Sequence, residues 1–349
     1  MKTFGFQWHL TDRCNMRCAH CYQEGFASDG EQGLETLKAA AGRIFAALPD
    51  RRVSINLTGG EPLLLPILFD LIEHLHTYPT LDEVNIITNG TVASDDVIKG
   101  IGSFPRVSTL KVSLESADAK INDRIRGEGN LSCVRENIAS FRRAGKSIVL
   151  MMTLSRFNLA SLEDTVRWSR EAGMDGVIVE RFVPLGLGRG FANQALLPQD
   201  WESALHAIAR ASGIGVDPET LLPFRAFWLS MGPCANPLRG ALCNLGGESM
   251  ALMPDGTVYP CRRFPIVVGN ILNEPFEGIL KRLEAYCPSE IRPKLNGVRC
   301  RTCAVEGCAG CRAIALALTG DALADDPQCP LSARLAAHGE GYPYRGQQQ

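Results

Sequence analysis

Three cysteines near the N-terminus have a spacing that suits an iron–sulfur cluster. Cys14, Cys18 and Cys21 form a C-x3-C-x2-C triplet that follows the apolar segment FGFQWHL, and no fourth cysteine is near. Thiolates are the usual ligands of such clusters, and a 4Fe–4S cluster with only three protein ligands leaves one iron open to an exogenous molecule. An open iron of this kind indicates catalysis.

A structural zinc site is the alternative explanation for the triplet. Closely spaced cysteines in a protein without a secretion signal are more often metal ligands than disulfides. Zinc in a structural role usually has four protein ligands. His20 lies inside the triplet and is a candidate for the fourth.

A second motif favours the catalytic interpretation. Gly59-Gly60-Glu61-Pro62 follows the strand-like stretch VSIN. Two glycines let a small ligand approach the backbone closely, and a glutamate supplies an acceptor for an ammonium group. Alone this motif is an ordinary turn sequence, but here it lies one strand–helix unit downstream of the triplet.

The triplet, the aromatic Tyr22 that follows it and the GGEP motif together resemble the signature of the radical S-adenosylmethionine (SAM) superfamily. The resemblance implies that a cluster on the triplet binds the amino acid end of SAM, and that Gly59, Gly60, Glu61 and Pro62 receive the SAM amino group. It also implies reductive cleavage of SAM to a 5′-deoxyadenosyl radical that takes hydrogen from an unactivated carbon of the substrate.

The composition indicates a globular protein. With 349 residues, 45% of them hydrophobic, the chain can bury a large core and has the length of about two domains. No apolar run approaches the about 20 residues of a membrane span, and a signal-peptide pattern is missing, so we expect a cytoplasmic protein. The 36 basic and 38 acidic residues form no long block of one sign, which gives no indication of nucleic-acid binding. The thirteen cysteines indicate metal ligands.

Short β-rich runs alternate with helical patterns up to about residue 190, which is typical of strand–helix units around a parallel sheet. Apolar residues at helical spacing between them, such as Leu37, Ala41 and Ile44, predict helices that cover the sheet. Six units match the superfamily's fold, an α/β open (β/α)6 partial TIM barrel. The predicted strands are Phe4–Leu10, Val53–Leu57, Val84–Thr88, Thr109–Leu114, Ile148–Thr153 and Val177–Phe182.

Further candidate ligands of SAM follow the predicted strands, where parallel barrels place their chemistry. Thr88 and Asn89 end the third strand, and Ser113 and Glu115, two residues apart, end the fourth on one side. Arg126 follows in the sequence INDRIRGEGN. These positions match those where radical SAM enzymes bind the ribose and carboxylate of SAM. The alternative is ordinary turn chemistry.

Nine more cysteines lie in the C-terminal third of the chain, and eight of them fall into a pattern. The segment MALMPDGTVYPC, between Cys243 and Cys261, predicts a β-hairpin that returns the second cysteine toward the first. Farther on, the chain contains two CxxC pairs and a distant final cysteine. The whole set is Cys234, Cys243, Cys261, Cys300, Cys303, Cys308, Cys311 and Cys329.

This array resembles the SPASM extension of radical SAM enzymes, which carries two auxiliary iron–sulfur clusters. The resemblance implies that Cys243, Cys261 and Cys311, with Cys234 as candidate fourth ligand, hold the first cluster. Cys300, Cys303, Cys308 and Cys329 would hold the second. The spacing departs from the usual one, because each gap after the first CxxC pair is one residue shorter in this chain. The ending CAGCRA is similar to the ending of SPASM enzymes that act in cofactor and haem biosynthesis.

Two zinc-ribbon sites are the alternative for the array, because paired CxxC units are also zinc ligands. The triplet upstream favours iron–sulfur. The assignments leave two cysteines: Cys133 is expected to be a small buried hydrophobic residue, and Cys287 a spare ligand. We divide the chain into a barrel over residues 1–190, a helical bridge over 191–232, a SPASM domain over 233–335 and a flexible tail over 336–349.

The resemblance implies SAM and three Fe–S clusters as cofactors. Many members with this extension modify peptides, so the leading substrate is a ribosomally made precursor peptide. The expected partners are a separate recognition protein and a flavodoxin- or ferredoxin-type reductant. The alternatives are modification of a tetrapyrrole or other cofactor precursor, and a non-catalytic metal-binding electron carrier. Sulfatase maturases of the family carry an acidic residue after the hairpin's second cysteine, where this chain has Arg262. We expect a monomer.

Overall fold

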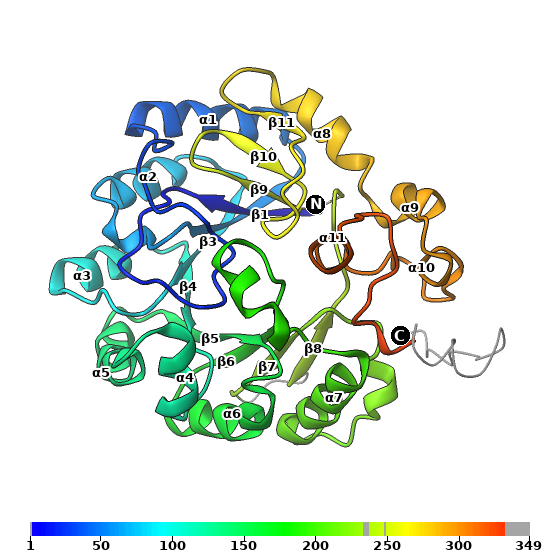
Figure 1. The fold of residues 1–349 in the computed structure, drawn as a ribbon. Helices are drawn as coiled ribbons and strands as arrows, with labels where there is room; N and C mark the ends of the chain where they lie inside the picture. Colours follow the sequence, from blue (N-terminus) through cyan, green and yellow to red (C-terminus); the bar gives the residue numbers. More distant parts are fainter. Residues whose placement is uncertain (1, 233–236, 248, 332–349) are drawn as a thin grey trace.

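The computed structural model describes residues 2–232, 237–247 and 249–331. Six parallel strands run in sequence order around the centre of the molecule, with helices outside them (Figure 1). This confirms the predicted α/β fold with its six strand–helix units. The strands are β1 (Thr3–His9), β2 (Arg52–Thr58), β3 (Leu81–Thr88), β4 (Val107–Ser113), β5 (Ser147–Leu154) and β6 (Gly176–Arg181).

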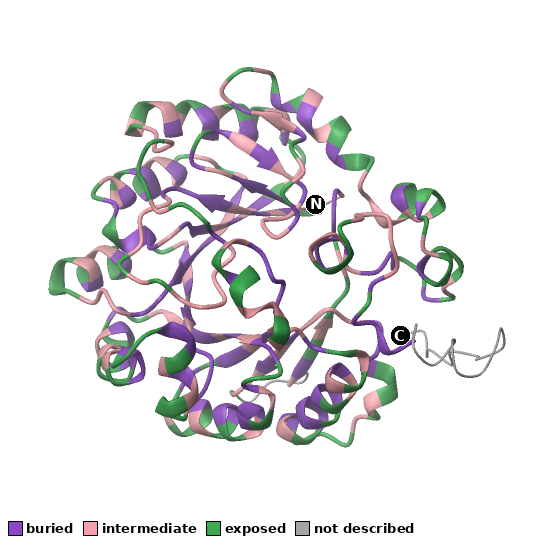
Figure 2. Cartoon of the chain, viewed as in Figure 1, coloured by how far each residue is buried: buried purple, intermediate pink, exposed green. Residues whose placement is uncertain are grey.

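The helices between these strands bury one face against the sheet, as Figure 2 shows. Leu37, Ala41 and Ile44 of the first helix are buried, which confirms the helical spacing expected there. The helices are α1 (Leu34–Ala47), α2 (Leu68–Leu75), α3 (Asp95–Ser103), α4 (Ala119–Arg126), α5 (Asn130–Arg143) and α6 (Leu162–Glu171). Short 3-10 turns lie at Pro62–Leu64 and Leu159–Ser161.

The segment predicted to be a helical bridge is helical only in part. It contains 3-10 turns at Gly186–Gln194 and Pro218–Leu221, and helix α7 (Pro198–Ser212), whose Trp201, Leu205 and Ile208 are buried as expected. Strand β7 (Ala226–Ser230) then pairs antiparallel with β6, and β8 (Leu238–Ala241) pairs with β7. The helical assignment of 226–230 was therefore wrong, because this run alternates between buried and half-buried side chains, which is the pattern of a strand.

The predicted hairpin of the cysteine-rich region is present and extends the other edge of the sheet. Strand β9 (Ser249–Leu252) pairs antiparallel with β10 (Thr257–Tyr259) and parallel with β1, and β11 (Gly269–Asn270) follows β10. Gly256 closes the turn with a φ of 82°, a conformation that favours glycine. The sheet thus has eleven strands among the described residues.

The rest of the C-terminal region consists of short helices packed beside the sheet. They are α8 (Phe276–Glu284), α9 (Pro288–Ile291), a 3-10 turn at Arg292–Lys294, α10 (Val298–Thr302) and α11 (Arg312–Thr319). Cys234 and the predicted tail over 336–349 lie outside the described residues. No helix within the described ranges is both long and apolar enough to cross a bilayer.

Candidate active site

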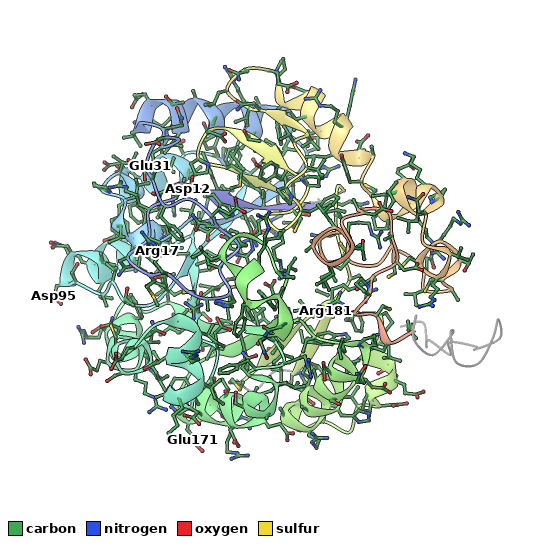
Figure 3. All side chains as sticks on the ribbon, viewed as in Figure 1. Asp12, Arg17, Glu31, Asp95, Glu171 and Arg181 are labelled. Atoms are coloured by element: carbon green, nitrogen blue, oxygen red, sulfur yellow. The ribbon has the colours of Figure 1, made fainter. Side chains whose placement is uncertain are left out.

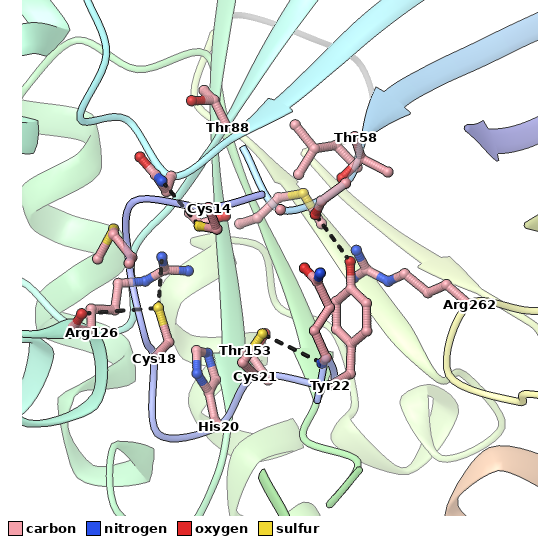
Figure 4. Close-up of a pocket in the computed structure, with 18 of the residues that line it drawn as sticks. Cys14, Cys18, His20, Cys21, Tyr22, Thr58, Thr88, Arg126, Thr153 and Arg262 are labelled. Carbon is pink, nitrogen blue, oxygen red and sulfur yellow. Dashed lines mark hydrogen bonds between the residues drawn. The ribbon is translucent and has the colours of Figure 1, made fainter. Parts of the chain in front are cut away.

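The cysteine triplet lines a cavity of about 120 Å³ at the carboxyl ends of the parallel strands (Figure 4). The register of β1 and β2 pairs His9 with Thr58, so the loops that follow the two strands meet. Of the predicted site residues, the cavity is lined by Cys14, Cys18, Cys21, Tyr22, Gly59, Gly60, Thr88, Asn89, Ser113 and Arg126. Glu61, Pro62 and Glu115 are not among its lining residues.

Polar groups surround the three thiols. The Asn89 side chain donates to Cys14 Sγ (3.7 Å), and Arg126 Nη1 lies 3.9 Å from Cys18 Sγ. The backbone N–H of Gln23 lies 3.5 Å from Cys21 Sγ. Burial raises the pKa of all three thiols, that of Cys18 to about 11. Buried thiols become thiolates when a metal replaces the proton, so this donor set, with an arginine beside it, fits an anionic iron–sulfur cluster.

The two glycines of the GGEP motif allow two loops to pack together. A Cβ on Gly59 would lie 2.3 Å from the Thr11 carbonyl oxygen, and one on Gly60 would lie 2.2 Å from the Arg13 carbonyl oxygen. The Gly60 N–H donates to Thr11 O (2.7 Å) and the Glu61 N–H to Arg13 O (2.8 Å). The glycines therefore fix the start of the triplet loop, in addition to facing the cavity.

Glu61 holds the ends of two strands together. Its side chain is fully buried and accepts hydrogen bonds from Thr88 Oγ1 (2.9 Å), the Asn89 N–H (2.7 Å) and the Leu63 N–H (3.1 Å). Burial raises the pKa of Glu61 to about 7, against the effect of these donors. Both carboxylate oxygens thus have protein partners, so in this structure Glu61 positions Thr88 and Asn89.

Glu115 has a similar place on the other side of the cavity. Its Oε1 accepts from Arg126 Nη2 (2.9 Å) and lies 2.9 Å from His20 Nε2, and its Oε2 accepts from the Thr153 N–H (2.7 Å). Although burial acts to raise the pKa of Glu115, the charges of His20 and Arg126 lower it. The carboxylate orients Arg126 and His20 toward the triplet, whereas Ser113 reaches the cavity itself.

Three cysteines of the first predicted auxiliary set pack in one apolar cluster. Cys243, Cys261 and Cys311 lie there together, and burial, with Cys311 and Cys261 nearby, raises the pKa of Cys243 to about 12. Although burial acts to lower the pKa of the neighbouring Arg263, Glu180 and the Cys261 and Cys311 thiols raise it. A partly buried cation beside two of these thiols fits an anionic cluster.

The second predicted set gathers completely. Cys300, Cys303, Cys308 and Cys329 line one small cavity together with Arg225. Arg225 Nη2 lies 2.7 Å from Cys308 Sγ, while its Nε and Nη1 are buried without a hydrogen-bond partner among the described residues. Four cysteines around a buried guanidinium match the donor set and the charge of an iron–sulfur cluster.

Sequence reasoning missed several residues of the main cavity. Arg262 and Arg263 lie in its wall, although they are 241 or more residues from the triplet. The only feature of the sequence that could have indicated them is their position directly after Cys261. His20 was considered only as a zinc ligand. Cys133 is half-buried on α5, and its Sγ lies 3.6 Å from Asn137 Nδ2. The other missed lining residues are Met16, Gln23, Phe26, Thr58, Ile87, Met151, Thr153, Phe182 and Val183.

Comparisons with known proteins agree with this geometry. Residues 8–169 match the family model described as radical SAM superfamily, and residues 243–311 match the SPASM model, described as an iron–sulfur cluster-binding domain. The chain is 29% identical to an AdoMet-dependent heme synthase of Methanosarcina barkeri, over 92% of this chain and 95% of the relative. It is 27% identical to the mycofactocin maturase MftC of Mycobacterium tuberculosis, over 92% and 81%.

The fold is similar to that of solved structures. A structure of anSMEcpe with bound AdoMet superposes with a TM-score of 0.73 at 17% identity and covers 97% of this chain and 96% of the other. The similarity therefore includes both the barrel and the C-terminal region.

Proposed function

Because this chain belongs to the radical SAM superfamily and carries a SPASM domain, we propose that it removes a hydrogen atom from an unactivated carbon of its substrate. The observation that carries the proposal is the convergence of Cys14, Cys18 and Cys21 on one cavity at the strand ends. These thiolates would hold a 4Fe–4S cluster, which with SAM bound would supply a 5′-deoxyadenosyl radical on one-electron reduction.

The residues of the chain bind and orient the reactants. Asn89, Ser113 and Arg126 line the cavity beside the triplet, and they are proposed to bind the ribose and carboxylate of SAM. Glu61 fixes the backbone at Asn89, and Glu115 holds the Arg126 guanidinium, through the hydrogen bonds described above. Buried positions of this kind reduce the reorganisation needed when the reactants bind.

The two C-terminal cysteine sets are proposed to hold auxiliary iron–sulfur clusters, which makes three clusters in all. The description of the matched SPASM model favours iron over the zinc-ribbon alternative. By the family resemblance, clusters held there would either accept an electron from the substrate radical or bind the substrate. An external flavodoxin- or ferredoxin-type protein would supply electrons to the triplet cluster.

A tetrapyrrole is the first candidate substrate. The relative named as a heme synthase matches nearly the full length of both chains. The CAGCRA sequence after Cys303 is similar to the ending found in SPASM enzymes of haem and cofactor biosynthesis. Both observations favour modification of a haem precursor over the peptide chemistry that the family resemblance alone places first.

A ribosomally made precursor peptide is the second candidate, with a crosslink, thioether or related bond as the product. The observation that favours it is the match to a mycofactocin maturase over 92% of this chain. In this case a separate recognition protein would present the peptide.

The test of the proposed function is anaerobic reconstitution with iron and sulfide, followed by SAM and dithionite. Production of 5′-deoxyadenosine is expected from the wild-type protein. Replacement of Cys14, Cys18 and Cys21 together by alanine should abolish it while about eight of about twelve irons remain, at four per cluster. Undiminished 5′-deoxyadenosine formation by the triple variant would refute the assignment. Deuterium-labelled haem precursors and precursor peptides can then be compared as substrates. The measurement is the amount of deuterium that each transfers to 5′-deoxyadenosine.

A further inference from the structure

The charged groups in the wall of the main cavity are strongly biased toward positive charge. Arg126, Arg262 and Arg263 line the cavity, whereas no Asp or Glu occurs among its described lining residues. Arg126 is paired with the buried Glu115 and lies next to Cys18. Arg262 lies on the opposite side of the triplet in Figure 4, beside Tyr22. The cavity therefore has two separate cationic ends.

Arg262 is held by contacts that leave part of its guanidinium unpaired. Its Nη2 lies 3.2 Å from Glu180 Oε2, and its Cζ lies 5.1 Å from the centre of the Tyr22 ring. The side chain is 10% exposed, and its Nε is buried without a hydrogen-bond partner among the described residues. A buried unpaired donor is costly, so this nitrogen is suited to an incoming acceptor.

The surrounding charges do not balance. Glu180 Oε2 is shared between Arg262 and Arg263, each at 3.2 Å, so that one carboxylate faces two guanidinium groups. Lys111 also faces Glu180, and its Nζ donates to Asn56 Oδ1 (2.6 Å). Burial alone would raise the pKa of Glu180, but Arg263, Arg262 and Lys111 lower it, which keeps the carboxylate ionised. An excess of positive charge remains at this end of the cavity.

Arg262 lies between two groups of thiols, because its charge acts on Cys21 of the triplet and also on Cys261. Arg263 lies near Cys261 and Cys311 and donates to the Arg181 carbonyl oxygen (3.0 Å). It is therefore placed to offset the charge of the first auxiliary cluster. Arg262 stacks on Tyr22, the residue after Cys21, and thus extends toward the SAM side. A second cavity of about 270 Å³, lined by Cys243 and Cys261, lies behind this pair and shares both arginines.

From this arrangement we infer that Arg262 binds a carboxylate group of the substrate, at the end of the cavity opposite Arg126. The inference rests on the proposed function, because it names the class of substrate for the same site. A carboxylate would pair with the free Nε and supply the missing negative charge next to Glu180. Propionate side chains of a tetrapyrrole and the C-terminal carboxylate of a peptide share this chemistry.

The test measures binding by the reconstituted protein. The probes are coproporphyrin III and its amide derivative, and a peptide with either a free or an amidated C-terminus. We expect the acid form of one pair to bind the wild type, and Arg262→Gln to weaken that binding by about tenfold. Arg262→Lys keeps the charge but lacks the Nε donor, so it should weaken binding less than Arg262→Gln does. The amide form should bind the wild type as weakly as the acid form binds Arg262→Gln. The pair of probes whose acid form binds more tightly than its amide form identifies the source of the carboxylate.

Arg239→Gln is the matched control, since Arg239 stacks on Trp228 in β7 and does not line the cavity. Unchanged affinity in Arg262→Gln, or equal binding of acid and amide forms to the wild type, would overturn the inference. So would a shift in the midpoint potential of an auxiliary cluster in Arg262→Gln with binding unaltered, because Arg262 would then serve the cluster. Failure of the proposed function is detected separately, as the absence of 5′-deoxyadenosine from the wild type.

Discussion

Arg181 and Asp326 form a buried ion pair that joins the barrel to the C-terminal region. Arg181 Nη2 lies 3.1 Å from Asp326 Oδ2, and the two side chains are 2% and 0% exposed. Asp326 also accepts a hydrogen bond from the Cys311 N–H (3.0 Å), and its own N–H lies 3.3 Å from Cys300 Sγ. Figure 3 labels Arg181 between the barrel and the C-terminal segment. Asp326 therefore connects strand β6 to cysteines of both auxiliary sets, through its carboxylate to Cys311 and through its backbone N–H to Cys300.

Asp326→Asn should destabilise the protein by about 3–5 kcal/mol, because it leaves Arg181 buried without a counter-charge. Chemical denaturation of the reconstituted protein under anaerobic conditions measures this loss. The matched control is Glu163→Gln in the exposed pair with Arg210, whose atoms are 2.6 Å apart. That substitution should cost much less, because solvent screens the exposed pair. Equal losses in the two variants would show that burial of the Asp326 pair has no energetic consequence.

Gly60→Ala should displace the triplet loop, because the added Cβ would lie 2.2 Å from the Arg13 carbonyl oxygen. We expect the variant to lose about four of about twelve irons, those of the triplet cluster, and with them 5′-deoxyadenosine formation. Gly25→Ala is the control, since a Cβ there meets no atom within 4 Å. Iron analysis and the SAM cleavage assay compare the two. Full iron content in Gly60→Ala would mean that the loops can separate without cost.

Glu61 should make the stability of the fold fall with rising pH. Its folded-state pKa of about 7 lies above the ordinary value of 4.5, so the folded protein binds this proton more tightly than the unfolded chain does. The stability that this raised pKa contributes to the folded state is fully present below pH 4.5 and is lost as the pH rises through 7. Compared with Glu61→Gln, the wild type should lose on the order of 1 kcal/mol between about pH 6 and about pH 8. Parallel pH profiles of the two proteins would contradict the raised pKa.

Cys329→Ala should destabilise the C-terminal region and abolish substrate modification. Cys329 lines the cavity of the second auxiliary set with Cys300, Cys303 and Cys308, and metal binding supplies folding free energy in cysteine-rich modules. The buried apolar core continues from the barrel into the C-terminal region and includes Cys329, but most of its members belong to the barrel. SAM cleavage without substrate should therefore survive at least in part. Full iron content together with normal turnover would show that Cys329 is not a ligand.

The barrel strands and the cysteine groups could be predicted from the sequence because both are carried by local patterns. The alternation of apolar and polar residues over Val53–Leu57 specifies a strand, and the Pro-Asp-Gly turn at 254–256 indicates the hairpin. The gathering of Cys300, Cys303, Cys308 and Cys329 on one cavity agrees with the pairing that the SPASM resemblance implied.

Side-chain direction at the site could not be predicted in the same way. A glutamate after a strand can face a ligand or accept hydrogen bonds from the neighbouring strand. For Glu61 the outcome depends on Thr88 and Asn89, which are 27 and 28 residues away. The pair of Arg181 and Asp326 spans 145 residues, and no periodic pattern connects them. The five-residue strand β7 was missed because its alternation is short and helical segments precede it.

The pairing of β9 with β1 has a consequence for the order in which the chain folds. Gly5 to Trp8 are synthesised first, yet their partners on one edge, Ser249 to Leu252, emerge more than two hundred residues later. Until then, one edge of β1 exposes unpaired N–H and C=O groups that can recruit strands from other chains. A nascent chain that stalls before residue 249 would therefore carry an aggregation-prone edge beside its first cysteines. Release of the complete chain removes that hazard, since the late hairpin covers the earliest strand.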